Sequence, residues 1–346
     1  MRPEGRPDCS KPGRMQERLQ GGQGPRFKNA RSDTKAVIDI GSNSIKLRVA
    51  RKRSGRLRTL VDTTEVVGLG RGLGSGLLQE GPIRNGVSAV RRFVRLAEGW
   101  GACSIRLVAT MALRSASNAE DFVRRVHQKT GLTVEILPGE EEARLAWLGA
   151  IYGLGMKSGK NVVFDTGGGS TEFIVGLEGG ISESRSLPLG AVLVTEKFFN
   201  ADPVLPESLE KAKNHILSMF ESEMELRAKA AGCPMIGIGG GVVAIASVKL
   251  GLPALRPKIV NGTLLTSSDI DSQVELYASR TLAERMEIPG LPPKRADIIL
   301  ASACIVQGLM KSLRADSFKV SINGLRHGLL VEMFKPKDRR RRNDFR

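Results

Sequence analysis

The feature that most constrains this chain is a pattern that occurs twice, near the start and near the middle. In each copy an apolar strand runs into an aspartate, a turn of glycine and small polar residues follows, and a second apolar strand begins. The copies are Ala36-Val37-Ile38-Asp39-Ile40-Gly41-Ser42-Asn43-Ser44 and Val162-Val163-Phe164-Asp165-Thr166-Gly167-Gly168-Gly169-Ser170. The pattern predicts two β-hairpins. Its repetition predicts two similar domains that face each other across a cleft.

Both turns have the composition of a phosphate-binding loop. Glycine lets backbone N–H groups approach an anion closely, and the hydroxyl side chains add further donors. A single turn of this kind is more often only a hairpin connection, so the prediction depends on there being two at matched positions. The predicted phosphate-binding residues are Gly41, Ser42, Asn43, Ser44, Gly167, Gly168, Gly169, Ser170 and Thr171.

Three carboxylates accompany these loops. Asp39 and Asp165 end the first strand of each hairpin, and Glu172 lies on the strand that leaves the second loop. Carboxylate oxygens are the ligands that Mg²⁺ prefers, and this ion commonly keeps several waters. We therefore predict a Mg²⁺ site on Asp39, Asp165 and Glu172. The alternative for Glu172 is an ordinary exposed strand residue.

Length and composition set the class of protein. A chain of 346 residues is long enough for two or three domains that each bury a core. The four cysteines have no paired spacing, so neither a zinc site nor a disulfide framework is indicated. No segment has the pattern of a signal peptide or approaches the roughly 20 apolar residues of a membrane span. We expect a cytoplasmic protein without a membrane partner.

The formal net charge of +17 is concentrated toward the two ends of the chain. Residues 1–35 and 335–346 are basic and poor in apolar residues, which predicts disordered tails. The four consecutive arginines at 339–342 are suited to non-specific polyanion binding. Only two Trp and two Tyr are present, and no aromatic residue interleaves with the basic runs. A dedicated nucleic-acid binder is therefore the weaker interpretation.

Periodicity predicts alternating strands and helices, hence an α/β protein with mixed sheets. The predicted strands are residues 36–40, 45–51, 105–109, 134–137, 162–165, 173–175 and 235–238. The predicted helices are residues 85–97, 119–129, 141–151, 206–230, 241–249, 268–280 and 294–311. With the glycine-containing segment 152–160 as the link, we expect one domain at 36–151 and a second at 152–334.

Five sequence blocks occur in a characteristic order. They are Asp39-Ile40-Gly41-Ser42-Asn43-Ser44, Ala109-Thr110-Met111-Ala112-Leu113-Arg114, Gly139-Glu140-Glu141-Glu142-Ala143-Arg144-Leu145, Asp165-Thr166-Gly167-Gly168-Gly169-Ser170-Thr171-Glu172 and Gly237-Ile238-Gly239-Gly240-Gly241. As a set they resemble the exopolyphosphatase and guanosine pentaphosphate phosphohydrolase family, over roughly residues 36–334. The resemblance implies two actin-like (ribonuclease H-like) domains around a phosphate-binding cleft.

The resemblance also implies an activity. We expect a Mg²⁺-dependent exopolyphosphatase that releases terminal orthophosphate from inorganic polyphosphate and that could also hydrolyse guanosine pentaphosphate. By position in the family motifs, Glu142 is the catalytic base and Arg114 contacts the substrate phosphate. Gly239 and Gly240, in a third glycine-rich turn that resembles one in actin-like kinases, are also predicted to bind phosphate. The alternatives are a non-catalytic polyphosphate or alarmone-binding regulator and an actin-fold kinase.

Each of these residues also has a structural interpretation. Acidic residues at a helix start complement the helix dipole, which would keep the pKa of Glu142 low and make it an ionised base. Glu141 would support it. Arg114 could instead form a surface ion pair with Glu120 or Asp121, and the Gly237–Gly241 turn could be only a close strand-to-helix connection.

The chain departs from the family pattern in three places. Lys46 occupies a position that is usually apolar or aromatic in relatives, and it could add a positive charge at the mouth of the first loop. His327 stands where many relatives carry glutamate, so the resemblance assigns its side chain no role. The fold is also expected to end near Phe334, without the additional C-terminal helical region of longer members, which implies a shorter grip on a polymer. Relatives are often homodimers, and we expect the same here.

Overall fold

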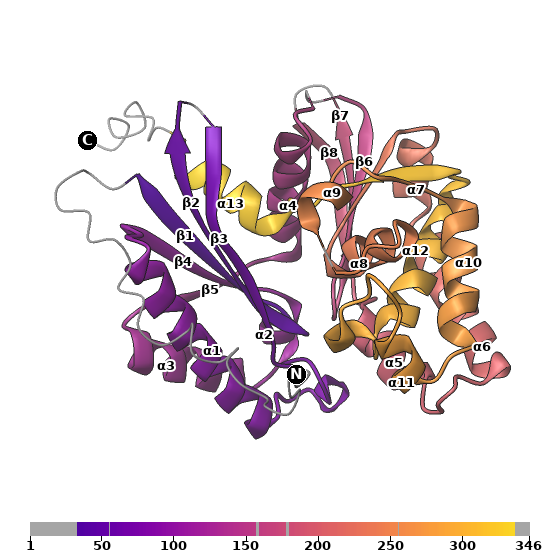
Figure 1. Cartoon of the computed structure of the whole chain (residues 1–346), viewed down its shortest axis with the longest axis horizontal. Coiled ribbons are helices and arrows are strands. Elements are labelled where there is room, and N and C mark those ends of the chain that lie inside the picture. The colour runs from indigo at the N-terminus through magenta and orange to yellow at the C-terminus, as the bar shows by residue number, and fades with distance from the viewer. Residues whose placement is uncertain (1–32, 55, 157–158, 178–179, 255, 336–346) are drawn as a thin grey trace, which may run out of the picture.

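The computed structural model describes residues 33–54, 56–156, 159–177, 180–254 and 256–335. Most of the two basic tails predicted to be disordered, residues 1–32 and 336–346, lies outside these ranges. Thr34 and Lys35, which were assigned to the first tail, belong to a β-strand, so that boundary was wrong. Two β-sheets stand side by side, each flanked by helices (Figure 1). The α/β class with mixed sheets that the sequence predicts is confirmed, since both sheets contain parallel and antiparallel pairs.

The first sheet has five strands in the order β3-β2-β1-β4-β5. They are β1 (Thr34–Ile40), β2 (Ser44–Arg53), β3 (Arg56–Val66), β4 (Ser104–Ala109) and β5 (Val134–Ile136). β1 and β2 form the predicted antiparallel hairpin, and β4 pairs with β1 in parallel. β1 is apolar and buried along nearly all its length, as a central strand covered on both faces must be.

The second sheet repeats this arrangement. Its six strands lie in the order β10-β11-β9-β6-β7-β8. They are β6 (Asn161–Thr166), β7 (Thr171–Leu177), β8 (Gly180–Leu187), β9 (Met235–Ile238), β10 (Leu264–Thr266) and β11 (Ser317–Val320). β6 and β7 form the second hairpin, and β9 pairs with β6 in parallel. The duplication predicted from the two loops is therefore present in the strand order as well.

Helices cover the outer faces of both sheets (Figure 1). The first half contributes η1 (Leu73–Ser75), α1 (Glu80–Gly99), α2 (Met111–Ser115) and α3 (Ala119–Thr130). The second contributes α5 (Ala191–Phe198), α6 (Pro206–Glu221), α7 (Met224–Ala230), α8 (Gly240–Lys249), α9 (Pro257–Val260), α10 (Ser267–Ala278), α11 (Leu282–Met286), η2 (Pro293–Arg295) and α12 (Ile299–Leu313). Apolar residues of α1 and α3 pack on the first sheet, and those of α8, α10 and α12 belong to the core of the second.

Each of the remaining two helices packs against the sheet of the opposite half of the molecule. α4 (Gly139–Gly153) follows the first sheet along the chain, yet it packs Trp147 and Ile151 against the second sheet. α13 (Leu325–Met333) comes last in the described chain and packs Leu329 and Leu330 under β1 of the first sheet. The two helices cross between the sheets in Figure 1. Each sheet thus receives one helix from the other half.

Several predicted boundaries were wrong. The helix expected over 206–230 is two helices, because the chain leaves helical geometry between Glu221 and Met224. The helix expected over 294–311 begins only at Ile299, after a short 3₁₀ turn that starts at the second of two adjacent prolines, Pro293. Proline has no backbone N–H and limits the residue before it, which favours a turn there. The sequence pattern did not predict strands β3, β8, β10 and β11 or helices α2, α5, α9, α11 and α13.

Candidate active site

The two glycine turns have the same local geometry. In the first, the Gly41 N–H donates to the Ser44 carbonyl at 3.1 Å, and in the second the Gly167 N–H donates to the Ser170 carbonyl at 2.9 Å. The turns meet tip to tip. A Cβ atom at position 169 would lie 2.5 Å from Ser42 Oγ, so only glycine lets the second turn come this close to the first. The two loops therefore form a single site.

A cavity of about 70 Å³ lies between the loops, with room for little more than one phosphate group. Nearly all the residues predicted to bind phosphate or metal face it. The predicted residues that line it are Asp39, Gly41, Ser42, Asn43, Ser44, Glu142, Asp165, Gly167, Gly168, Gly169, Ser170, Glu172, Gly239 and Gly240. Residues from both halves of the sequence thus converge as expected.

Two predicted residues do not line this cavity. The Thr171 side chain is fully buried and its hydroxyl donates to the Leu189 carbonyl at 2.6 Å, so this hydroxyl supports the loop. Arg114 does not line the cavity, but it contacts Glu142, which does. Its Nη1 lies 2.7 Å from the Leu137 carbonyl and 3.1 Å from Glu142 Oε2. The ion pair with Glu120 or Asp121 considered as its alternative does not form, since Asp121 pairs with Arg124 and Arg125.

Unpartnered polar atoms face the same cavity. Both side-chain polar atoms of Asn43 and the hydroxyl of Thr166 are buried without a hydrogen-bond partner among the residues that the structure describes. Leaving such groups unpaired costs on the order of 1–3 kcal/mol each. A bound oxyanion and its water would satisfy them, which fits a phosphate site.

The carboxylates are crowded and buried. Burial, together with the charge of Asp39, raises the pKa of Asp165 to about 6, although Lys46 works in the opposite direction. Burial and the charge of Asp165 raise the pKa of Glu172 to about 7, and hydrogen bonds from Ser170 and Ser186 only partly offset this. A cation between these groups would relieve the mutual repulsion.

The carboxylates of the site fit Mg²⁺ only if water and phosphate oxygens supply the rest of its ligands. Among residues 33–335 as described, no three His, Cys, Asp or Glu side chains stand close enough together to hold a metal ion by themselves. Asp39, Asp165 and Glu172 nevertheless face one small cavity. Mg²⁺ usually keeps several waters and takes further oxygens from phosphate, so the set is suited to this ion. The Mg²⁺ site stays a prediction.

The environment of Glu142 differs from the expectation. Glu142 does lie in the first turn of α4, but burial raises the pKa of its carboxyl well above the usual value, and Glu172 and Asp165 add to the rise. Arg114 opposes the rise through its hydrogen bond and charge. The prediction of a low pKa was therefore wrong, because the carboxyl is buried and, secondarily, because carboxylates from the other half of the chain lie beside it.

A hydrogen-bonded chain connects Glu142 to Glu172. Arg114 bonds to Glu142 at 3.1 Å and reaches Ser186 Oγ at 3.5 Å, and Ser186 donates to Glu172 Oε1 at 2.8 Å. Ser186 on β8 had no signal in the sequence. Glu141, expected as a support for Glu142, instead pairs with Arg144, which also binds Glu332 on α13.

The third glycine turn closes the cavity from the second half. Gly239 has φ +102°, and a Cβ there would lie 2.7 Å from both Asp165 Oδ1 and the Thr166 carbonyl oxygen. A Cβ on Gly240 would overlap the guanidinium of Arg295. The turn is thus a close strand-to-helix connection that also lines the site. The sequence analysis missed Arg295, which it placed inside a helix.

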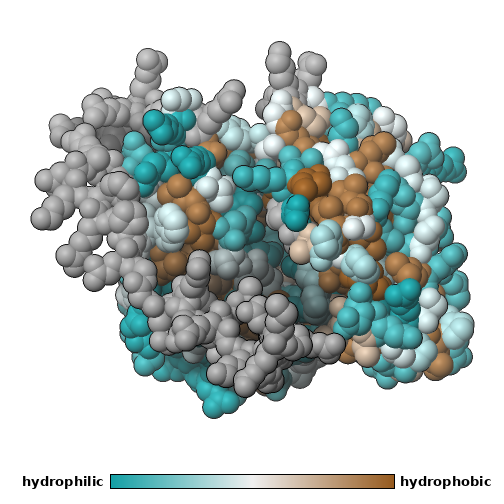
Figure 2. Space-filling model, viewed as in Figure 1, coloured by the Kyte–Doolittle hydropathy of each residue, from teal (hydrophilic) through white to brown (hydrophobic). Residues whose placement is uncertain are grey.

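A second, larger cavity of about 830 Å³ adjoins the first. The two share Asp39, Lys46, Asp165 and Arg295 among their lining residues. The larger cavity is rich in cations, which are Lys46, Arg48, Arg256, Lys258, Arg295 and Arg326. The carboxylates of the larger cavity are only Asp39, Asp62 and Asp165, so positive charge predominates there. Figure 2 shows hydrophilic and hydrophobic surface side by side where the two halves meet.

Comparison with known proteins decides the family. Residues 48–337 match the Ppx/GppA phosphatase family. The chain belongs to the Ppx/GppA family. The resemblance stated from the five sequence blocks is confirmed.

Individual Ppx/GppA relatives agree. The chain is 28% identical over 307 residues to guanosine-5′-triphosphate,3′-diphosphate pyrophosphatase of Photobacterium profundum, across 88% of this chain and 60% of that protein. It is 27% identical over 310 residues to a bifunctional 3-dehydroquinate synthase/phosphatase of Fusobacterium nucleatum, across 86% of this chain and 46% of that protein. The chain therefore spans roughly half the length of these two relatives.

Solved Ppx/GppA structures share the fold. The Aquifex aeolicus PPX-GPPA enzyme matches with a TM-score of 0.73 and 31% identity, across 86% of this chain and 99% of that chain. An exopolyphosphatase from Cytophaga hutchinsonii matches with a TM-score of 0.80 at 24% identity, across 87% and 97% of the two chains, which bears on the fold alone. The predicted actin-like architecture is confirmed. No helix within the described ranges is long and apolar enough to cross a membrane.

Proposed function

We propose that the protein is an exopolyphosphatase, which hydrolyses the terminal phosphoanhydride of inorganic polyphosphate and releases orthophosphate. The observation that carries the proposal is the pair of adjoining cavities. The small one suits a terminal phosphate, and the larger one is lined by an excess of cations that suits the phosphates behind it. Family membership supports the reaction class.

The reaction needs a water molecule aimed at the terminal phosphorus, opposite the bridging oxygen that leaves. In the proposed step the water oxygen forms a new P–O bond, the bond to the bridging oxygen breaks, and the water proton passes to the Glu142 carboxylate. Glu142 lines the small cavity beside the loops that would hold the phosphate. Its raised pKa makes it a better proton acceptor once it is ionised.

Arg114 is a positioning residue in this scheme. Its hydrogen bond of 3.1 Å orients the Glu142 carboxylate, and its charge opposes the rise in the pKa of that group. It therefore keeps a larger fraction of Glu142 ionised at neutral pH. The backbone N–H groups and hydroxyls of the two loops, with Asn43, would hold the phosphate oxygens.

Asp39, Asp165 and Glu172 would hold Mg²⁺, partly through water. When bound, the ion would supply positive charge against the phosphate oxygens of the substrate. The fit rests on the three carboxylates facing one cavity and on the raised pKa values of Asp165 and Glu172.

A second substrate, guanosine pentaphosphate, is favoured by one further observation. The larger cavity also carries apolar side chains, namely Val243, Ile259, Ile322 and Leu325. Its volume of about 830 Å³ lies in the range of pockets that bury a nucleoside-sized ligand. A polyphosphate chain alone would not need an apolar wall. The expected homodimer and cytoplasmic location stay predictions.

Orthophosphate release tests the proposal. The substrates are long polyphosphate, short polyphosphate, guanosine pentaphosphate and ATP, each with Mg²⁺. We expect release from polyphosphate that falls by orders of magnitude in Glu142→Gln and persists in Glu140→Gln, an exposed glutamate in the same helical turn. Tight polyphosphate binding without release in the native protein would favour the non-catalytic regulator. Transfer of phosphate to an acceptor in place of water would favour the kinase.

A further inference from the structure

A glycine-rich loop of the first half connects the first phosphate loop to the second half of the molecule. It spans residues 67–76, directly after β3, and includes the 3₁₀ turn η1. In Figure 1 it follows the lower end of β3, whereas α4 and α13 cross near the top of the view between the two sheets. None of its residues lines either cavity of the candidate active site. The proposed hydrolysis therefore assigns it no part.

This loop holds the backbone of the first phosphate loop. The N–H groups of Val67 and Gly68 both donate to the Asn43 carbonyl, at 3.1 and 2.9 Å. The Gly70 N–H donates to the Ser42 carbonyl at 2.7 Å. A Cβ at position 70 would lie 2.8 Å from Ser42 Cβ, so only glycine allows this close approach. Because Ser42 and Asn43 line the small cavity, a movement of the loop would displace two residues predicted to bind phosphate.

The same loop reaches the second half through two contacts. Arg71 Nη2 lies 2.6 Å from Asp297 Oδ2, in the turn before α12. The Gly72 N–H donates to Glu196 Oε1, on α5, at 3.1 Å. Gly68 supports the first contact, because the Arg71 side chain lies over it and a Cβ there would stand 2.8 Å from Arg71 Cδ. The loop therefore joins the two halves at two points.

Asp297 belongs to a segment that builds the small cavity. Arg295 and Ile298, on either side of it in the sequence, both line that cavity. Burial lowers the pKa of the Arg295 guanidinium, and the negative charge of Asp297 works in the opposite direction. Arg295 also lines the larger cavity. The ion pair between Arg71 and Asp297 therefore ties the first phosphate loop to the part of the second half that carries Arg295.

We propose that Arg71 is a positioning residue, which keeps the two halves closed around the substrate by bonding to Asp297. This role rests on the hydrolysis proposed above. The two phosphate loops come from different halves, so their spacing depends on contacts between the halves. A misplacement of about 1 Å at a reacting group can cost a hundredfold in rate. Arg71 lines neither cavity, so its loss should lower kcat more than it raises KM.

A double-mutant cycle in polyphosphate hydrolysis tests the proposal. Arg71→Gln and Asp297→Asn each remove one partner, and each should lower kcat about fivefold, equivalent to the ~1 kcal/mol of a well-formed exposed ion pair. The double variant should be no slower than Asp297→Asn alone, because the same contact is lost. Arg71→Lys keeps the charge and should retain most of the activity. An unchanged kcat in Arg71→Gln, or losses that multiply in the double variant, would overturn the proposal.

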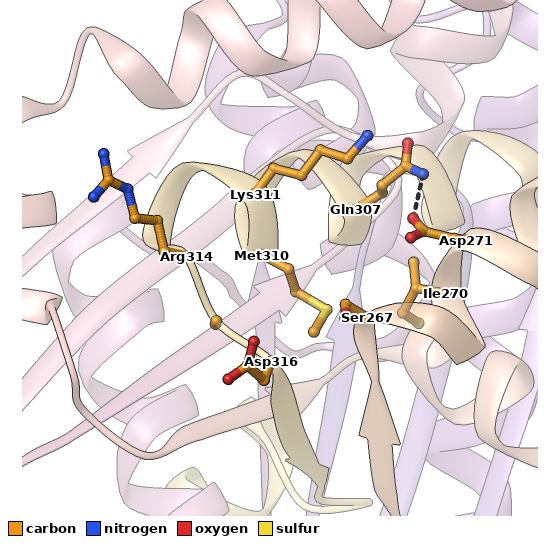
Figure 3. Close-up of a pocket in the computed structure, with 9 residues that line it drawn as sticks. Ser267, Ile270, Asp271, Gln307, Met310, Lys311, Arg314 and Asp316 are labelled. Carbon is orange, nitrogen blue, oxygen red and sulfur yellow. Dashed lines mark hydrogen bonds between the residues drawn. The ribbon is translucent and has the colours of Figure 1, made fainter.

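Two charged residues outside the cleft provide matched controls. Arg106→Gln breaks an ion pair of 2.6 Å with Glu135 inside the first half. Asp316→Asn changes an exposed aspartate beside a pocket between α10 and α12 (Figure 3), which shares no lining residue with the two cavities of the site. Both variants should keep the native kcat. A fivefold loss in either control would overturn the assignment of the effect to the contact between the halves.

Hydrogen exchange tests the contact without relying on activity. The Gly70 and Gly72 amides are hydrogen-bonded to Ser42 and Glu196, so residues 67–76 should exchange slowly in the native protein. Arg71→Gln should speed this exchange while the Tm stays near the native value, because exposed ion pairs add little to global stability. Unchanged exchange would overturn the proposal. If the native protein released no orthophosphate, the proposed hydrolysis would fail, and exchange would still decide whether Arg71 holds the loop.

Discussion

Lys46 and Glu172 occupy the same position in two equivalent hairpins, each directly across the strand pair from the aspartate that precedes the glycine turn. Asp39 pairs with Lys46 in the first hairpin, and Asp165 pairs with Glu172 in the second. The Lys46 ammonium lies 3.5 Å from Asp39. The duplicated scaffold thus presents a cation on one side of the site and an additional carboxylate on the other.

Removing the cation of Lys46 should weaken substrate binding. Lys46 lines both cavities, so it can attract the terminal phosphate and the one behind it. For Lys46→Met we expect KM for polyphosphate to rise about tenfold, equivalent to ~1.4 kcal/mol, with a smaller change in kcat. Steady-state kinetics check this. Lys46→Arg keeps the charge and should stay near the native KM. A loss confined to kcat would contradict the role in binding.

Mg²⁺ should stabilise the protein more at alkaline than at acidic pH. The folded-state pKa values of Asp165 and Glu172 are raised to about 6 and about 7, so without metal their contribution to stability is present at low pH and is lost as pH rises through those values. Each shift corresponds to on the order of 3 kcal/mol. Mg²⁺ needs the ionised carboxylates, so its effect on Tm should be larger at pH 8 than at pH 5.

The control for this prediction replaces one carboxylate. Glu172→Gln should flatten the pH dependence of the metal-free protein and reduce the Tm gain from Mg²⁺. Glu135→Gln changes an exposed glutamate on β5 and should leave both unchanged. Equal Mg²⁺ effects at the two pH values in the native protein would argue against metal binding by these groups.

His327 should make the protein sensitive to acid. It is buried, its Nδ1 lies 3.3 Å from Arg48 Nη1, and burial together with Arg48 lowers the pKa of His327 to about 4. The unfolded chain takes up a proton near pH 6.5 while the folded chain does not, so stability falls as pH drops from about 6.5 toward 4. The loss should approach ~3 kcal/mol. Urea unfolding over this pH range measures it.

His327→Gln should reduce this acid loss, because an amide oxygen can still accept a hydrogen bond from Arg48 without gaining a proton. His127→Gln changes an exposed histidine and should retain the native pH dependence. If His327→Gln follows the native curve, the acid sensitivity comes from another group.

A methyl group on Gly328, where α13 crosses α4, should destabilise the folded protein. A Cβ on Gly328 would overlap the Leu145 carbonyl oxygen, and the backbone cannot move aside as a side chain would. For Gly328→Ala we expect a loss of ~1–3 kcal/mol in the free energy of unfolding, as for overpacked cores. Chemical denaturation measures this. Gly81→Ala, in α1 where a Cβ meets nothing within 4 Å, should cause no loss.

The parts of the site that depend on local sequence pattern could be predicted from the sequence. The strands before Asp39 and Asp165, the turns after them and the position of Glu142 at a helix start all follow from short-range signals. These signals also predicted which residues meet, because the pattern is duplicated and the halves must face each other. The expected helix at 206–230 was wrong because two adjacent positions leave helical geometry without a proline or glycine to mark them.

The effects of one half of the molecule on residues of the other half could not be predicted from the sequence. The pKa of Glu142 is raised first by burial and then by Glu172 and Asp165, and both effects arise only where the two halves meet. Arg295 and Ser186 reach the site through tertiary packing and belong to no motif. The exchange of α4 and α13 was also unpredictable, because an amphipathic helix pattern does not say which sheet it covers.

That exchange has a consequence for the newly made chain. One face of the first sheet is only partly covered until α13 arrives, because Leu137 and Leu145 are the only described residues between β4 and α13 in the cluster around Val37 and Val108. Lys35 at the start of the sheet donates a hydrogen bond to the Met333 carbonyl, 298 positions later. During synthesis this face therefore stays incompletely covered until almost the last described residue has left the ribosome. Contacts of such long sequence separation fold slowly. A ribosome-bound chain that stops before Leu325 should thus bind chaperones more strongly than one that includes α13.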